Sequence, residues 1–280
     1  MISRNFGFMQ GRLSPIFRNK IQSFPHNNWK SEFYWAKKLG FSHIEWTVDQ
    51  YFINFNPISY SSGLEEIKNI KKITSIKINS LTADFIMDEP FFKSEFSIKN
   101  LIEKQLEKII LNASKVGIKC FVVPLVDNAK IENNNQKKNI ISFFRNLSTF
   151  IKKNKIKIAF EIDLKPKKVI NFLDSIKDDN FGINFDTGNS ASLNYNSEEE
   201  IKLYNNRIFN IHLKDRILNG DTVRFGSGNT NFNLIFEQLN RINYKKSFTI
   251  QMARSKSNKH IQEIKFAKNY IDKLIKSYDC

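Results

Sequence analysis

Four residues that can bind a metal ion stand at the ends of short apolar runs in the second half of the 280-residue chain. They are Glu161 in AFEID, Asp186 in INFDTGN, His212 in NIHLKD and Gln251 in TIQMA. Successive members are separated by 25, 26 and 39 residues. Each interval is about the length of one strand plus one helix, so the four side chains would come from neighbouring parallel strands. Because the carboxyl ends of such strands meet at one rim, we expect the four to converge.

Together the four side chains offer two carboxylates, an imidazole and an amide oxygen. Such a mixed nitrogen and oxygen site suits Mn²⁺, Mg²⁺, Co²⁺ or Zn²⁺. Each residue alone has a plainer explanation, since an acidic strand end can cap the next helix and a strand histidine can be a satisfied core group. Four such residues on successive strands favour metal binding over these separate explanations. The sequence therefore predicts a site for one divalent metal ion.

The whole chain alternates between short β-branched or aromatic runs and longer amphipathic stretches, which predicts repeated strand and helix units. Strands are expected at residues 5–9, 43–46, 77–81, 119–124, 157–162, 181–185, 208–213 and 247–251. Helices are expected at residues 29–39, 63–74, 98–116, 135–153, 167–176, 198–204, 232–241 and 259–276.

Eight units in this chain average about 35 residues each, which is enough for a strand, a helix and two loops. The segments KLGF at 38–41 and KVGI at 115–118 repeat one pattern, a glycine that ends a helix just before a strand. The predicted fold class is α/β, a single (β/α)8 TIM barrel that forms one domain over residues 1–280. An open doubly wound sheet is the alternative fold, and the length alone also permits two small domains.

Several segments resemble the xylose isomerase-like barrel superfamily, in particular its sugar phosphate isomerase and epimerase branch. The resemblance is carried by MQGRLSP at 9–15, GFSHIEW at 40–46, Glu161, DTGN at 186–189 and HLKDR at 212–216. It implies a metal-dependent enzyme that moves a proton on the carbon next to a sugar carbonyl and stabilises the enediolate that results. The same superfamily includes endonuclease IV-like enzymes.

The resemblance also implies roles for single residues. Glu161, Asp186 and His212 match family metal ligands, and Glu161 matches a glutamate that shuttles protons. The position of a second proton-carrying glutamate holds Gln251, whose amide oxygen can bind metal but cannot accept a proton. A second proton carrier must then come from elsewhere.

By their location, Lys214, Asp215 and Glu45 are the candidates for this second proton carrier. Glu45 stands between the apolar pair at 43–44 and Trp46, where burial would raise its pKa as a general acid requires. An ion pair between Glu45 and a lysine is the equal alternative. The sequence leaves both readings of Glu45 open.

Cations near strand ends can hold a substrate phosphate or polarise its hydroxyls, which nominates Arg12, Lys214 and Arg216. Alternatively, these cations are surface charges that do not contact a substrate. Gln10, Asn189 and Asp215 lie in the same motifs and are predicted to bind substrate. The segment DTVRFGSGN at 221–229 is expected to be a mobile loop whose two glycines let the backbone approach an anion.

A formal net charge of +16 is compatible with a phosphorylated substrate or with nucleic acid. The lysines are dispersed over many helical segments, however, and accompany an excess of Asn, Ile and Phe, so biased composition explains most of the charge. An endonuclease IV-like activity is disfavoured, because such enzymes use several histidines for three metal ions. This chain has four histidines, and Asn189 stands where a histidine would follow DTG.

Three functional alternatives therefore accompany the isomerase or epimerase prediction. They are a metal-dependent dehydratase or lyase on a keto-sugar or polyol, the nuclease, and a barrel that binds sugar without turning it over. The expected partner is a small sugar or sugar phosphate, and a homodimer would follow family habit. Two cysteines, Cys120 and Cys280, make no disulfide framework. With neither a signal peptide nor a membrane span in the sequence, we expect a cytoplasmic protein.

Overall fold

The eight principal strands of the computed structural model, which describes residues 5–17, 20, 22–51, 53–255 and 257–277, form a closed parallel barrel. Neighbours follow the order β1-β10-β7-β6-β5-β4-β3-β2 around the barrel. The strands are β1 (Phe6–Met9), β2 (His43–Thr47), β3 (Lys77–Thr82), β4 (Cys120–Leu125), β5 (Lys157–Ile162), β6 (Phe181–Asp186), β7 (Ile208–Leu213) and β10 (Phe248–Ile250). This confirms the predicted (β/α)8 barrel and excludes the open sheet.

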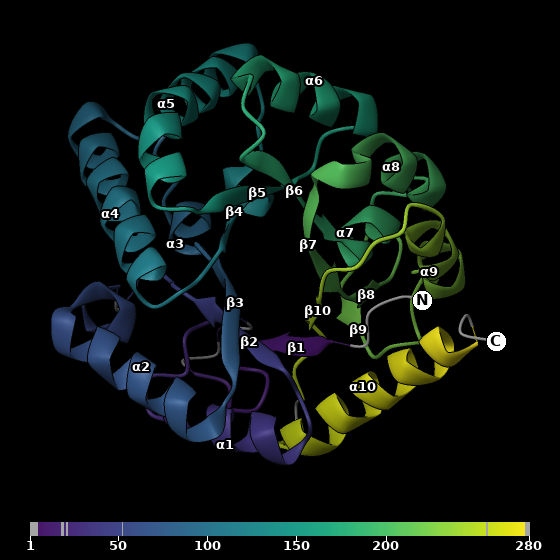
Figure 1. Ribbon diagram of the computed structural model, residues 1–280. Coiled ribbons are helices and arrows are strands. Elements are labelled where there is room, and N and C mark those ends of the chain that lie inside the picture. Colours follow the sequence, from purple (N-terminus) through teal and green to yellow (C-terminus); the bar gives the residue numbers. More distant parts are fainter. Residues whose placement is uncertain (1–4, 18–19, 21, 52, 256, 278–280) are drawn as a thin grey trace.

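Helices surround the strands as an outer ring (Figure 1). They are α1 (Trp29–Lys38), α2 (Ser61–Thr74), α4 (Phe96–Lys115), α5 (Asn134–Lys153), α6 (Pro166–Ile176), α8 (Ser197–Tyr204), α9 (Phe232–Arg241) and α10 (His260–Lys276). All eight lie within two residues of the predicted boundaries at each end. No helix in the described part of the chain is long and apolar enough to cross a membrane.

Local sequence explains where these helices begin and end. The Asn133 side chain accepts a hydrogen bond from the backbone N–H of Gln136 and so caps α5, while Pro166 opens α6 at a position where no N–H is needed. Gly40 and Gly117 follow α1 and α4 with φ of +66° and +83°, in the left-handed region that glycine adopts without strain. The two predicted return loops are therefore present.

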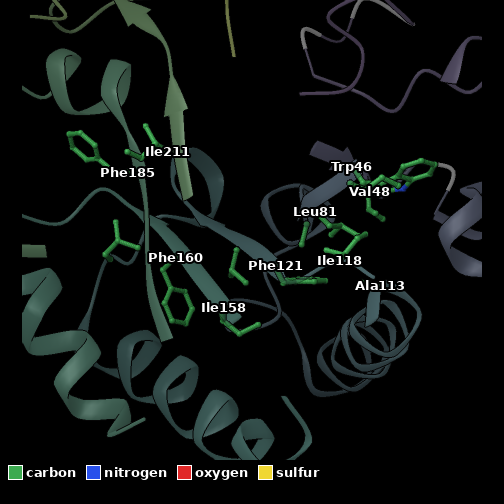
Figure 2. Packing of buried hydrophobic residues seen from close by; sticks show 14 of the residues in the cluster. Trp46, Val48, Leu81, Ala113, Ile118, Phe121, Ile158, Phe160, Phe185 and Ile211 are labelled. Carbon is green, nitrogen blue, oxygen red and sulfur yellow. The ribbon is translucent and has the colours of Figure 1, made fainter. Parts of the chain in front are cut away.

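Phenylalanines fill much of the layer between the strands and the helices. Phe160 of β5 packs edge-on against Phe144 of α5 and Phe172 of α6, with ring centroids 4.9 and 5.1 Å apart. All three side chains are fully buried, and each contributes roughly 1.5–3 kcal/mol of burial free energy. Figure 2 draws part of this layer, including Ile158 and Phe160 of β5. This apolar packing fixes the strand ends that carry the polar residues described below.

Some short elements escaped the sequence analysis. They are α3 (Phe85–Asp88), α7 (Thr187–Ser192) and a small hairpin of β8 (Asp215–Arg216) and β9 (Thr222–Val223). Their segments are too short for a hydrophobic period to become visible. The strand predicted at 247–251 also ends one residue earlier, at Ile250, so Gln251 follows β10 directly.

Candidate metal centre at the C-terminal end of the barrel

Three of the four predicted metal ligands meet at the C-terminal ends of consecutive strands. Glu161 of β5, Asp186 of β6 and His212 of β7 are buried, and one ligand atom of each lies within 4.8 Å of the others. The His212 Nδ1 atom is 3.2 Å from Glu161 Oε2 and 3.9 Å from Asp186 Oδ2. The parallel register of β6 and β7 pairs Asp186 directly with His212, which is why residues 26 positions apart become neighbours.

Asp186 is both a helix cap and a site residue. Its Oδ1 atom accepts hydrogen bonds from the backbone N–H groups of Gly188 (2.9 Å) and Asn189 (2.8 Å), which starts helix α7. Its Oδ2 atom faces the site, 2.7 Å from the Lys214 Nζ atom. Burial opposes ionisation of Asp186, but Lys214 and His212 hold its pKa below the usual range. Asp186 therefore caps α7 with one oxygen, as the plainer explanation expected, and keeps its other oxygen in the candidate site.

Glu45 orients the imidazole of His212. The Glu45 Oε1 atom lies 2.6 Å from His212 Nε2, so the imidazole presents Nδ1 to Glu161 and Asp186. Burial disfavours the imidazolium of His212, but the charges of Glu45 and Glu161 outweigh it and raise the pKa to about 10. His212 is therefore held by carboxylates on both ring nitrogens.

The structure corrects the expected chemistry of Glu45. Although burial favours its neutral form, the charge and hydrogen bond of His212 and hydrogen bonds from Ser80 and Asn210 lower the pKa of Glu45. A general acid needs the opposite shift. The partner of Glu45 is also a histidine and not the lysine that the alternative reading supposed. Glu45 thus acts here as an ionised group that positions His212.

Two asparagines in the barrel interior were missed by the sequence analysis. Asn184 Nδ2 donates to Glu161 Oε2 at 2.7 Å and lies 3.0 Å from His212 Nδ1. Asn210 Nδ2 donates to Glu45 Oε2 at 2.8 Å and to Asn184 Oδ1 at 2.9 Å. Each asparagine stands two residues before a predicted ligand on the same strand, so side-chain alternation already placed both on the inner face.

Two buried oxygen atoms at this end of the barrel accept no hydrogen bond from the described residues, as a cation ligand would. One belongs to Asp186 of the cluster and the other to Gln251, directly after β10. Asp186 Oδ2 accepts no hydrogen bond in the described structure apart from its ion pair with Lys214. Gln251 Oε1 is likewise buried with no hydrogen-bond partner among the described residues, while its Nε2 donates to Met9 Sδ (3.2 Å) and Gln22 Oε1 (3.2 Å). Carboxylate and amide oxygens beside one imidazole nitrogen are ligands that Mn²⁺, Mg²⁺ or Zn²⁺ accept.

Comparison with known proteins agrees with this geometry. Residues 33–270 match the family model described as "Xylose isomerase-like TIM barrel". The chain belongs to this family. The match includes Glu45, Glu161, Asp186, His212 and Gln251, and it confirms the resemblance on which the predicted roles depend.

Proteins named as sugar epimerases are among those similar to this chain in sequence or in fold. The chain is 26% identical over 272 residues to the Haemophilus influenzae protein named "Putative L-ribulose-5-phosphate 3-epimerase SgbU", covering 89% of this chain and 93% of the relative. D-allulose 3-epimerase from Methylomonas sp. has the same fold, with a TM-score of 0.73, 14% identity and coverage of 96% and 97%. The IOLI protein, solved with a zinc atom, superposes with a TM-score of 0.77, 18% identity and coverage of 98% and 99%.

In this xylose isomerase-like barrel, two residues of the loop after β1 are buried near the site. Arg12 is buried, so it is not the surface charge that the sequence analysis kept as an alternative. Its Nε donates to the Met252 carbonyl (3.1 Å) and its Nη2 to Gln22 Oε1 (3.1 Å). Burial, with the neighbouring Arg254, lowers the pKa of Arg12 to about 9. Gln10 Oε1 accepts a hydrogen bond from the backbone N–H of Thr47.

The glycine-rich loop after β7 differs from the expectation. Asp215 is fully buried, and its oxygens accept hydrogen bonds from the backbone N–H groups of Gly226 (2.8 Å), Gly228 (3.0 Å) and Thr230 (3.1 Å). The two glycine N–H groups that were expected to face a bound anion therefore donate to the Asp215 carboxylate instead. Asp215 shapes this loop, which corrects its predicted roles in substrate binding and proton transfer.

Asn189 connects the candidate ligands to two cations of the same strand end. Its Nδ2 donates to Glu161 Oε1 at 2.6 Å, and its Oδ1 accepts from Arg216 Nη1 at 2.8 Å and from Lys214 Nζ at 3.4 Å. Arg216 also donates from Nε and Nη2 to the Gly220 carbonyl, so part of its guanidinium stabilises the hairpin. Asn189 thus lies beside Glu161, and Lys214 and Arg216 reach the same place through Asn189, while their roles toward a substrate stay predictions.

Asp84, just after β3, is a further buried carboxyl group that the sequence analysis missed. It accepts hydrogen bonds from Thr82 Oγ1 (2.8 Å) and Gln22 Nε2 (2.7 Å). Burial, and to a smaller extent the charges of Asp88 and Glu161, raise the pKa of Asp84 to about 7. Its position after the strand in SLTAD was the available signal, because the same criterion had identified Glu161.

Proposed function

We propose that this chain is a metal-dependent epimerase or isomerase of a small sugar or sugar phosphate. The observation that carries the proposal is the convergence of Glu161, Asp186 and His212 at the C-terminal end of the barrel. Active sites of (β/α)8 enzymes lie at this end. Membership of the xylose isomerase-like family, and relatives named as sugar epimerases, support the same reaction class.

One divalent ion, Mn²⁺, Mg²⁺, Co²⁺ or Zn²⁺, would be held by Glu161, Asp186 and His212, with Gln251 Oε1 as the fourth ligand. Bound there, it would polarise the carbonyl of a keto-sugar and make the neighbouring C–H more acidic. Lys214, which now pairs with Asp186, would share that carboxylate with the ion or turn its ammonium group to the substrate.

Glu161 is the proposed base that removes the proton next to the carbonyl. Asn184 and Asn189 each donate to a different oxygen of Glu161, which holds the carboxylate in one orientation within the site. A positioned base of this kind contributes roughly 10²- to 10⁴-fold to a proton-transfer rate.

Asp84 is the proposed second proton carrier, a role that Gln251 cannot fill because its amide does not accept a proton. The two residues are linked through Gln22, whose Oε1 accepts from Gln251 Nε2 and whose Nε2 donates to Asp84 Oδ2. With a pKa of about 7, the Asp84 carboxyl can hold or release a proton near neutral pH. Glu45, with its lowered pKa, and Asp215, bound to the loop backbone, are less suited to this role.

For the substrate we propose a keto-sugar that carries a phosphate group. Lys214 and Arg216 reach Asn189 at the edge of the site, and Arg12 keeps one Nη1 atom without a hydrogen-bond partner in the described structure. Guanidinium and ammonium groups are suited to phosphate or to sugar hydroxyls. The name of the Haemophilus influenzae relative supports a pentulose 5-phosphate.

A dehydratase or lyase is the second candidate, because Gln251 replaces the second proton-carrying glutamate of family epimerases. It would remove the same proton through Glu161 and then expel a hydroxyl group. The nuclease is less well supported, since one histidine, His212, belongs to the candidate cluster among the described residues.

Proton exchange distinguishes these reactions. Purified protein is incubated with ribulose 5-phosphate, unphosphorylated ribulose and allulose in D₂O, with each of the four metal ions in turn, and the sugars are analysed by NMR. Deuterium at the carbon next to the carbonyl, together with the epimer, is expected. Loss of water would favour the lyase, and absence of exchange with every sugar and metal ion would contradict the proposal.

A further inference from the structure

A second cavity lies at the opposite end of the barrel from Glu161 and His212. Its volume is about 240 Å³, and it is lined by residues at the beginnings of β3, β4, β5, β7 and β10. Three lysines reach its wall from separate segments, Lys119 before β4, Lys157 at the start of β5 and Lys246 before β10. The strands therefore separate this cavity from the candidate metal centre.

Phe209 brings two of these lysines together. The Nζ atoms of Lys157 and Lys246 lie 4.6 and 5.0 Å from the centroid of the Phe209 ring, which also lines the cavity. Lys246 donates a hydrogen bond to the Ile208 carbonyl at 2.6 Å, which fixes its direction. Burial and then the charge of Lys157 lower the pKa of Lys246. Two cations are therefore held close enough to repel one another.

This positive charge is not neutralised by the protein. No described carboxylate forms an ion pair with Lys119, Lys157 or Lys246. The carboxylate behind the cavity wall, Glu45, is turned to His212. An anion in the cavity would relieve the repulsion between the lysines, and a concave site focuses such a potential.

The remaining wall of the cavity is polar and rigid. Asn79 Nδ2 donates to Ser247 Oγ at 3.2 Å across β3 and the segment before β10. Ser80 and Asn210, also in the wall, donate their hydrogen bonds inward to Glu45. These hydrogen bonds fix the polar part of the wall, while the three lysines are exposed to solvent and accessible to a ligand.

We propose that this cavity binds the phosphate group of inorganic phosphate or of a small phosphorylated metabolite. The cations Lys119, Lys157 and Lys246 supply charge and hydrogen-bond donors, and lysine is a common phosphate ligand. The volume is smaller than the roughly 300–1,000 Å³ of most drug-sized sites, which suits a small anion. This inference does not depend on the reaction at the other end of the barrel.

Calorimetric titration with inorganic phosphate, at constant ionic strength maintained with chloride, tests the proposal. The full chain is compared with a Lys157→Gln/Lys246→Gln variant and with a matched Lys104→Gln/Lys108→Gln variant, which removes the same charge from the exposed face of α4. We expect saturable binding that is at least about tenfold weaker in the first variant and unchanged in the second. Thermal denaturation of each variant checks folding.

A third variant, Lys214→Gln, separates this cavity from the mouth of the barrel. Phosphate binding that survives in Lys214→Gln and weakens in Lys157→Gln/Lys246→Gln supports the proposal. The opposite pattern, equal weakening in the matched lysine variant, or no saturable binding to the full chain would overturn it. Glycerol 3-phosphate binding more tightly than inorganic phosphate would identify a phosphorylated metabolite, and weaker binding would identify free phosphate.

Discussion

The two ends of the barrel differ in whether their charged side chains have partners of opposite charge. Strand β5 begins with Lys157 and carries Glu161 near its other end, and β7 begins beside Phe209 and ends beside His212. At the C-terminal end, carboxylates face a histidine and Lys214, so charges are paired within the site. At the N-terminal end, lysines surround an aromatic ring without a described carboxylate partner. The proposed metal site and the proposed phosphate site would therefore lie at opposite ends of one barrel.

A polar network fills the interior between these two ends. Ser80 and Asn210 line the N-terminal cavity and donate to Glu45, which in turn holds the imidazole of His212. Such a network is stable only when each buried group has a hydrogen-bond partner. Here Asn210 donates to Glu45 and to Asn184, and Asn184 donates to Glu161, so the two amides join the two carboxylates. The geometry of the candidate ligands at the C-terminal end therefore depends on residues buried halfway along the barrel.

The largest effect is expected at the proposed base. Glu161→Gln keeps the shape of the side chain but cannot accept a proton, so deuterium exchange into the sugar should fall by roughly 10²- to 10⁴-fold. Glu107→Gln, on the exposed face of α4, is the matched control and should exchange normally. Full exchange by Glu161→Gln with metal bound would refute the assignment of the base.

Asp84→Asn should have the next largest effect and should change the pH profile. The raised pKa of about 7 means that Asp84 is protonated below pH 7, so a rate that needs it as proton donor falls as the pH rises through 7. The amide cannot titrate, and we expect this limb to disappear with a rate loss of about 10²-fold. Asp88→Asn, one helical turn away, should keep the limb but move it to lower pH, because the charge of Asp88 helps to raise the pKa of Asp84. A limb unchanged in Asp84→Asn would exclude the role.

Glu45→Gln should weaken metal binding without preventing it. The glutamine can still accept the hydrogen bond from His212 Nε2, but it no longer places a negative charge on the imidazole. Loss of such an outer partner typically costs about 10- to 100-fold in metal affinity. Ser80→Ala, which removes one donor to Glu45 and keeps its charge, should cost less. Equal metal affinities in wild type and Glu45→Gln, from competition with a fluorescent chelator, would contradict this.

Glu200→Gln should change the stability of the fold in a pH-dependent way. Burial is the main reason that the pKa of Glu200 rises to about 7, so its ionisation opposes folding. This penalty is absent below about pH 4.5 and complete above pH 7, where removing the charge should raise the free energy of unfolding by on the order of 2–3 kcal/mol. Urea denaturation at pH 4.5 and 8 measures the difference, with Glu107→Gln on the exposed face of α4 as control. A gain that is the same at both pH values would be inconsistent with a raised pKa.

The sequence predicted the barrel well because hydrophobic periodicity and helix-ending glycines are local signals. Strands β5 and β7 and helix α9 have the predicted boundaries. The proximity of the candidate ligands Glu161, Asp186 and His212 was also predicted, since their spacing follows the repeat of the fold. Periodicity fails for α3, α7 and the hairpin, whose segments are shorter than the pattern needed to recognise them.

What the sequence could not predict depends on contacts between distant segments. The pKa of Glu45 falls because His212, 167 residues away, is its partner, and no local pattern contains that pairing. The sequence also could not show that both oxygens of Asp215 accept hydrogen bonds from backbone N–H groups of the loop that follows it. The lysine cavity likewise appears only when the starts of separate strands are brought together in the closed barrel.

Metal content tests the central claim most directly, that the C-terminal end of the barrel is a metal centre. Wild type, Asp186→Ala, His212→Ala and the exposed control Asp174→Ala are purified, incubated with Mn²⁺, Co²⁺, Mg²⁺ or Zn²⁺, desalted and analysed by mass spectrometry of the metal. We expect about one ion per chain in wild type and in the control, and a loss in the two site variants. No bound metal in the wild type, or equal metal in all four proteins, would contradict this account.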